Sequence, residues 1–186
     1  IPDYPRILRE GLSGVYDELA SMKEEATDPE HADFLDALMV CCEAARDLAA
    51  RYAAEAERSA AEEKDEKRAS ELREIARVCR KVPCEPAETF REALQSLWFT
   101  HMLIMTAESY PGAGLSHGRF DQYMYPYLRA DLDDGRLDEE QAMEILECYW
   151  IKHNYAYDFQ CRVMTNQGIN SGFGQLLTIG GIDEDG

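Results

Sequence analysis

The stretch Ser116-His-Gly-Arg-Phe-Asp-Gln-Tyr-Met-Tyr-Pro-Tyr127 joins a glycine-rich loop to an amphipathic helix. On its N-terminal side, residues 108–118 contain three glycines and one proline, which indicates a loop or a tight strand passage. On its C-terminal side, apolar residues recur at helical spacing from Arg119 to Leu132. The Asp-Asp-Gly sequence at 133–135 then predicts the end of that helix.

Helical periodicity also extends over most of the chain before this loop. It predicts a first helix from Pro5 through Met22 and a second from a cap at Asp28 to Ala56. A charged break at 62–68 follows. A third helix is then predicted from Leu72 to a stop at Val82-Pro83, and a fourth from residues 85–88 through Met105. Residues 93–107 are apolar on most sides, so we expect this helix to be buried only against further protein. Poor solubility of the isolated chain would follow.

After the loop, the sequence predicts one more helix and a short strand. Asp138, with Gln141 three residues later, has the pattern of a capping box before a helix that runs to Ile151. The apolar run at 176–179 is bounded by glycines and predicts a buried strand. The expected fold is therefore mainly α with a few strands. A single strand cannot form a sheet, so the rest of the sheet is expected elsewhere.

Composition and charge narrow the range of partners. The chain has 186 residues, with 19 Lys and Arg against 37 Asp and Glu, a net charge of −18. This excess of negative charge argues against nucleic acid and against anionic membrane surfaces. No apolar run is long enough for a membrane helix, and the N-terminus does not have the pattern of a signal peptide. We therefore expect a cytoplasmic protein.

The six cysteines give no metal motif. They stand at 41, 42, 79, 84, 148 and 161, and no pair has the C-x-x-C spacing. Without a secretory signal they are expected to be reduced thiols, and tetrahedral metal sites favour tighter paired spacings.

Both ends of the sequence suggest that it is an internal piece of a longer protein. The first residue is Ile1 instead of Met, and the last residues follow directly on the predicted strand.

Three blocks in a fixed order carry a resemblance to a known family. They are Arg80-Lys-Val-Pro-Cys-Glu-Pro-Ala-Glu-Thr-Phe-Arg-Glu-Ala-Leu-Gln-Ser-Leu-Trp-Phe99, then Ser116 to Tyr127 continuing to Asp131 and Gly135, and then Leu177-Thr-Ile-Gly-Gly181. The Gly-Arg-Phe-Asp-Gln-Tyr sequence is the most specific part. With the Arg51-Tyr52-Ala53 stretch, the ordered set resembles the glycyl radical enzymes of the pyruvate formate-lyase-like family over nearly the whole chain.

The resemblance implies a fold and a chemistry. Family members form a ten-stranded α/β barrel surrounded by helices, and residues 1–186 would be a single partial domain of it. A glycyl radical near the C-terminus passes its unpaired electron to a cysteine at the barrel centre, and the thiyl radical takes hydrogen from a small-molecule substrate. A separate activating enzyme with an iron–sulfur cluster and S-adenosylmethionine installs the radical. An anaerobic setting and a homodimer at full length are also implied.

The sequence departs from the family pattern at the two radical positions. The cysteine loop of the family reads Gly-Cys-x-Glu and its radical glycine stands in an Arg-Val-x-Gly-Tyr motif, and neither pattern occurs here. No catalytic residue is therefore assigned in this chain. The segment is expected to precede both motifs and to be inactive by itself, as a piece of a lyase or decarboxylase that cleaves a C–C or C–X bond.

The loop before Gly118 approaches the barrel interior in family members, which implies substrate-binding candidates. These candidates are Glu108, Ser109, Ser116, His117 and Arg119. Glycines allow a ligand to approach the backbone closely, a serine hydroxyl can donate to an oxyanion, and an arginine can hold a carboxylate with two parallel hydrogen bonds. The alternative for Arg119 is structural, as the ion-pair partner of Asp121 or Glu108.

The same loop bears on the substrate and on metal ligation. Diol-dehydrating members carry Asn-Gly-His-Ser here, whereas this chain has Tyr110-Pro-Gly-Ala-Gly114, which argues against a glycerol- or choline-type substrate. An arylacetate and a 2-oxo acid remain open as substrates. His101 and His153 have no partner at metal-ligand spacing, so no metal site is predicted from them, and His31 is expected near a helix start.

A second interpretation needs no radical chemistry. The acidic surface and the alanine-rich long helix also suit a non-catalytic helical interaction protein, or a decayed or split relative that binds a complete enzyme. The Gly-Arg-Phe-Asp-Gln-Tyr sequence and the glycine-rich loop before it favour the enzyme over the interaction protein. A scaffold has no need of three glycines beside a buried arginine.

Overall fold

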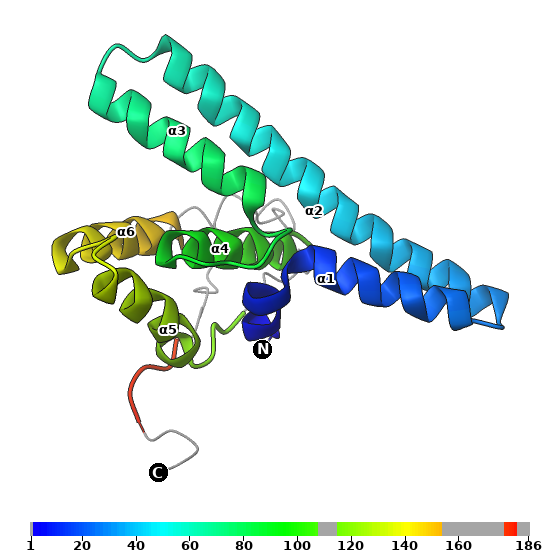
Figure 1. Ribbon diagram of the computed structural model, residues 1–186. Helices are drawn as coiled ribbons and strands as arrows, with labels where there is room; N and C mark the ends of the chain where they lie inside the picture. Colours follow the sequence, from blue (N-terminus) through cyan, green and yellow to red (C-terminus); the bar gives the residue numbers. More distant parts are fainter. Residues whose placement is uncertain (1, 108–114, 154–176, 182–186) are drawn as a thin grey trace, which may run out of the picture. The chain divides into compact units, whose positions relative to one another are not determined.

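A computed structural model describes residues 2–107, 115–153 and 177–181 (Figure 1). Within these ranges the chain forms six helices: α1 (Tyr4–Glu25), α2 (Pro29–Glu62), α3 (Glu66–Lys81), α4 (Phe90–Ala107), α5 (Phe120–Asp133) and α6 (Glu139–Lys152). The chain divides into two compact units, one of residues 5–99 and the other of residues 1–4 and 100–186. Each unit has its own group of buried side chains.

The unit of residues 5–99 is built on the pair α2 and α3, which lie side by side (Figure 1). The predicted start of α2 is confirmed, because the Asp28 side chain accepts a hydrogen bond from the amide of Glu30, with Pro29 as first helical residue. Leu35 is buried near the start of α2, and the buried positions beyond it follow a helical period and are all small: Ala45, Ala49, Ala53, Ala56 and Ala60. Small side chains on one face allow the neighbouring backbone to approach closely.

A kink in α1 ties this helix to the segment that follows α3. Gly11 has φ 67° and ψ 172°, a conformation that only glycine adopts readily. The kink turns two amides away from α1: Leu12 N–H donates to the Pro83 carbonyl at 2.8 Å, and Ser13 N–H donates to the Cys84 carbonyl at 2.9 Å. The kink therefore replaces bonds within α1 by bonds to the segment before α4.

The start of α4 differs from the prediction. The helix begins at Phe90 and not at residues 85–88, because the Ala87 amide donates to the Leu8 carbonyl at 2.9 Å instead of entering a helix. Thr89 Oγ1 accepts from the Glu92 amide at 3.2 Å and so caps the helix.

The burial of α4 also differs from the expectation. Most of its apolar side chains are already buried within this chain, with Leu97 1% and Phe99 2% exposed, whereas Leu103 and Ile104 are partly buried. The expectation that they are buried only against further protein is therefore wrong, since the chain's own residues cover them. The argument for poor solubility that rested on it does not hold for these side chains.

In the other unit, α5 and α6 follow their sequence signals. The helix expected from Arg119 to Leu132 is α5, and the turn at 133–135 ends it with Gly135 at φ 68°. The capping box of α6 is confirmed: the Asp138 side chain accepts from the Gln141 amide at 2.8 Å, and the Gln141 side chain accepts from the Asp138 amide at 3.0 Å.

Replacing Asp138 by Ala is expected to destabilise the chain by about 1 kcal/mol, because it leaves an amide of the first turn of α6 without its acceptor. Urea unfolding followed by circular dichroism measures this loss. Glu144→Ala is the matched control, since Glu144 is exposed inside the same helix and outside its first turn. An equal effect of the two substitutions would contradict the role of the cap.

The predicted strand is not formed in the described residues. Residues 177–181 make one isolated parallel bridge, between Gly118 and Leu177, and no described residue belongs to a longer strand. Ile179 is 69% exposed, so the prediction of a buried strand is wrong for this chain. A strand buries its side chains only between layers, and the described part of the chain supplies no second strand to pair with it.

The remaining sequence expectations concern thiols and membranes. The described cysteines, at 41, 42, 79, 84 and 148, are all free thiols, whereas Cys161 lies outside the described residues.

No helix in the described ranges combines the length and the apolar character that a membrane crossing requires.

Candidate functional site

The second and third sequence blocks meet in space. The Thr178 amide donates to the Gly118 carbonyl at 3.0 Å, and the Gly180 amide donates to Asp121 Oδ2 at 2.7 Å. The hydrogen bond from the Gly180 amide lowers the pKa of the Asp121 carboxyl. Two segments that are more than fifty residues apart in sequence are thereby held together by their backbones.

Arg119 lies at this junction. Its Nε is 3.7 Å from Asp121 Oδ1, and both side chains are about one-third exposed, at 35% and 34%. The ion pair with Asp121 is one that the sequence analysis considered, whereas Glu108 lies outside the described residues. The geometry places the guanidinium beside the Gly180-Gly181 turn, because a side chain at Gly181 would lie 3.9 Å from it.

The other candidates of the loop are placed as follows. Ser116 is partly buried, and its Oγ accepts a hydrogen bond from the Gly118 amide at 3.0 Å, which shapes the turn before α5. Gly118 adopts φ 64°, which suits glycine at this turn. Glu108, Ser109 and Tyr110 lie outside the described residues, as does the segment 166–175.

His117, between Ser116 and Gly118, is fully buried in a group of rings. Its Nε2 lies 2.8 Å from the Tyr149 hydroxyl and 3.1 Å from Nε2 of His153. Its carbonyl accepts from the Tyr123 hydroxyl at 2.9 Å. The ring of His101 lies nearby, tilted by 30° to that of His117, with 4.2 Å between the two ring centroids. Within the described part of the chain, Nδ1 of His117 has no hydrogen-bond partner.

Four helices, α1, α4, α5 and α6, and the loop before α5 bring these rings together. His101 is on α4, and its Nδ1 is 2.6 Å from the hydroxyl of Tyr4, the first residue of α1. Tyr149 and His153 are four residues apart at the end of α6 and therefore share one helix face. Nδ1 of His153 is 2.9 Å from the Tyr149 carbonyl, which can only accept a hydrogen bond.

Burial sets the protonation of the group. Burial, together with the nearby His101 and His153, lowers the pKa of His117 to about 3. Burial lowers the pKa of His153 as well, despite its bond to a carbonyl. The pKa values of Tyr4, Tyr123 and Tyr149 are raised by burial. At neutral pH these histidines and tyrosines are therefore uncharged.

The structure corrects the spacing argument on the histidines. His101, His117 and His153 each offer one ring nitrogen, and these three nitrogens lie within 4.8 Å of one another. Sequence spacing could not reveal this group, because the members are 16 and 36 residues apart and come from different elements. Sequence spacing could suggest one contact of the group, that between Tyr149 and His153, because residues four apart on a helix lie on the same face.

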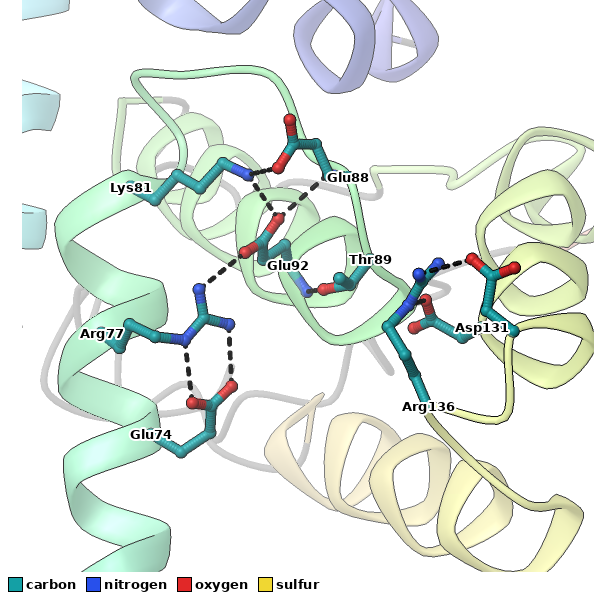
Figure 2. A network of polar contacts seen from close by, with 9 residues as sticks. Glu74, Arg77, Lys81, Glu88, Thr89, Glu92, Asp131 and Arg136 are labelled. Carbon is teal, nitrogen blue, oxygen red and sulfur yellow. Dashed lines mark hydrogen bonds and ion pairs between the residues drawn. The ribbon is translucent and has the colours of Figure 1, made fainter.

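The unit of residues 5–99 holds a charged network around a buried carboxylate (Figure 2). Glu92 is 2% exposed and accepts hydrogen bonds from Lys81 Nζ at 2.9 Å, from Arg77 at 3.0 Å and from the Glu88 amide at 3.0 Å. Burial alone would raise the pKa of Glu92, but these donors outweigh it, so the pKa is lowered. The network joins α3 to α4 and is structural in character.

Comparison with known proteins places these features in a family. The sequence pattern of the pyruvate formate lyase-like family matches residues 1–186. The isethionate sulfite-lyase of Nitratidesulfovibrio vulgaris is 36% identical over 100% of this chain and 23% of its own length. The indoleacetate decarboxylase of Tractidigestivibacter scatoligenes is 34% identical over 98% of this chain and 21% of its own length.

A solved structure agrees. The structure described as 1,2-propanediol dehydration in Roseburia inulinivorans superposes with a TM-score of 0.76 and 42% identity, over 82% of this chain and 20% of that chain. The family match and the likeness to solved glycyl radical enzymes place the chain in the class of glycyl radical enzymes. The chain belongs to the pyruvate formate lyase-like family. It spans less than a quarter of the length of the relatives named here.

Proposed function

We propose that the protein containing this chain is a glycyl radical lyase that cleaves a C–X bond of a small, negatively charged substrate. The match over the full chain to a sulfite-lyase, at 36% identity, is the observation that carries this proposal. The activating enzyme would be a separate protein that installs the radical with S-adenosylmethionine. The described residues would contribute helical scaffold and one wall of the substrate site.

The substrate loop supports a substrate other than glycerol or choline. The chain has no Asn-Gly-His-Ser sequence in residues 108–118, whereas Arg119 adds a positive charge at the start of α5. An arginine suits a sulfonate or carboxylate group because its guanidinium donates two parallel hydrogen bonds. The ion pair with Asp121 makes Arg119 in part structural, so Ser116 is the better candidate for substrate contact.

A second candidate function is decarboxylation of an arylacetate. The 34% identity to an indoleacetate decarboxylase favours it. It breaks a C–C bond instead of a C–X bond, with the same radical. Cleavage of a 2-oxo acid remains a further member of the same chemistry.

An assay of the complete protein separates these candidates. The protein is produced at its full natural length, activated without oxygen by an activating enzyme, and given isethionate, indoleacetate and pyruvate in separate reactions. Release of sulfite supports the proposed function, release of carbon dioxide from indoleacetate supports the second candidate, and turnover of none of the three contradicts both. Omission of the activating enzyme is the control.

Replacing Ser116 by Ala is expected to raise the KM of that complete enzyme about tenfold, because one hydrogen bond to the substrate is worth about 1.4 kcal/mol. Steady-state kinetics with the substrate found above measure it. Ser13→Ala, at an exposed serine of α1, is the matched control and should leave KM unchanged. Unchanged kinetics of the Ser116 variant would show that its hydroxyl serves only the turn at Gly118.

A further inference from the structure

His101, His117 and His153 form a group to which the proposed function assigns no metal, although His117 itself belongs to the candidate substrate loop. His101 and His117 are 0% exposed, and His153 is partly buried. One ring nitrogen of each lies within 4.8 Å of those of the other two. Polar side chains are rarely buried without a partner, so two buried imidazoles and a third that is partly buried at this separation call for a specific role.

Hydrogen bonds hold His153 in the form that binds metals. Its Nδ1 lies 2.9 Å from the Tyr149 carbonyl, and a carbonyl accepts only, so the proton is on Nδ1. Nε2 of His153 then carries a lone pair and lies 3.1 Å from Nε2 of His117. Metal-binding histidines commonly donate their other ring N–H to a backbone carbonyl in this way.

The separation of these nitrogens also suits a metal ion. Two nitrogens at bond lengths of about 2.0–2.1 Å from a tetrahedral Zn²⁺ lie about 3.3 Å apart. The 3.1 Å between His117 and His153 is close to that value. His101 has its Nδ1 at 2.6 Å from the Tyr4 hydroxyl, which is the kind of outer partner that orients a ligand ring.

His117 faces His153 through Nε2, so Nε2 is its ligand atom in such a site. Its other nitrogen, Nδ1, is buried and has no hydrogen-bond partner in the described part of the chain, so hydrogen bonding alone does not account for a histidine enclosed at this position. Buried polar atoms normally have a partner.

We propose that His101, His117 and His153 form a binding site for one divalent transition-metal ion of the Zn²⁺ class. Imidazole nitrogens suit Zn²⁺, Ni²⁺ and Cu²⁺, whereas Mg²⁺ and Ca²⁺ need oxygen ligands. Within the described residues the group contains no carboxylate. The ion would link α4, the end of α6 and the loop before α5.

Titration of the metal-free protein tests the site. The protein at its full natural length, prepared without the activating enzyme and stripped by a chelator, is titrated with Zn²⁺ alone in a calorimeter. We expect one ion per chain, and an affinity at least about 100-fold weaker in His117→Gln and in His153→Gln, because each removes one ligand. His31→Gln is the matched control, since His31 is exposed on α2, and its affinity should equal that of the wild type.

X-ray absorption spectroscopy of the zinc-loaded wild type identifies the atoms bound to the ion. It therefore tests the site even where a glutamine variant does not fold. Three imidazole ligands support the site. Sulfur ligands would assign the zinc to cysteines instead, and no stoichiometric zinc in the titration, or full affinity in both glutamine variants, would overturn the proposal. None of these measurements depends on radical activity, so they do not rest on the proposed function.

Discussion

Replacing Gly11 by Ala should destabilise the chain by about 3–5 kcal/mol. A Cβ at this position would lie 2.1 Å from the Cys84 carbonyl oxygen and 2.7 Å from two backbone carbons, distances that no side-chain motion can relieve. The conformation, φ 67° and ψ 172°, adds about 1–3 kcal/mol of strain for any residue with a Cβ. Relief requires the segment after α3 to move away from α1, with loss of the two backbone hydrogen bonds that join them.

Gly135 provides a control with nearly the same φ. Its φ is 68°, but nothing lies within 4 Å of a Cβ added there, so Gly135→Ala carries only the conformational cost of about 1–2 kcal/mol. Urea unfolding of the 186-residue chain with both variants measures the difference. Equal losses for the two glycines would contradict the close approach of Gly11 to the backbone of Cys84.

Replacing Glu92 by Gln should destabilise the chain by about 2–3 kcal/mol. The carboxylate is buried between the two cations Lys81 and Arg77, and the neutral amide leaves both without their shared acceptor. The effect is smaller than for a fully buried pair, because Arg77 is 52% exposed and keeps its bond to Glu74. Glu74→Gln, which removes only that exposed pair, should cost less than about 1 kcal/mol in the same urea experiment.

The pH dependence of the Glu92 effect has a definite sign. The pKa of Glu92 is lowered in the folded chain, so the stability that its charge contributes is present above the unfolded pKa of 4.5. It is lost as the pH falls through the lowered folded pKa. The difference in stability between wild type and Glu92→Gln should thus be constant above pH 6 and should shrink below about pH 4.5. A difference that persists undiminished at pH 3 would contradict the ionised, paired carboxylate.

Local signals in the sequence predicted local structure well. The caps at Asp28 and Asp138 depend on neighbours within three residues, and both are observed. The end of α3 at Val82 follows from the proline after it. The kink at Gly11 was not predictable, because its cause is the backbone of Cys84, more than seventy residues further along the chain. The start of α4 was misplaced for the same reason, since the Ala87 amide has a distant acceptor in Leu8.

In the candidate site, too, the sequence predicted features that depend on neighbouring residues and missed contacts between distant segments. The three motif blocks identified the family, and two of them meet at Gly118 and Asp121, although no periodicity argument places them together. The buried histidine group was missed because each member sits alone in its own segment of sequence. The expected buried strand failed because a strand is buried by partners, and the described residues supply one bridge only.

Electron paramagnetic resonance shows whether the complete protein carries a glycyl radical. The protein at its full natural length is incubated without oxygen with an S-adenosylmethionine-dependent activating enzyme and a reductant, and an established glycyl radical enzyme serves as positive control. We expect a stable organic radical with the doublet signal of a glycyl radical, which disappears on exposure to air. Absence of that signal beside a radical in the positive control would contradict this expectation and would favour the non-catalytic, partner-binding interpretation.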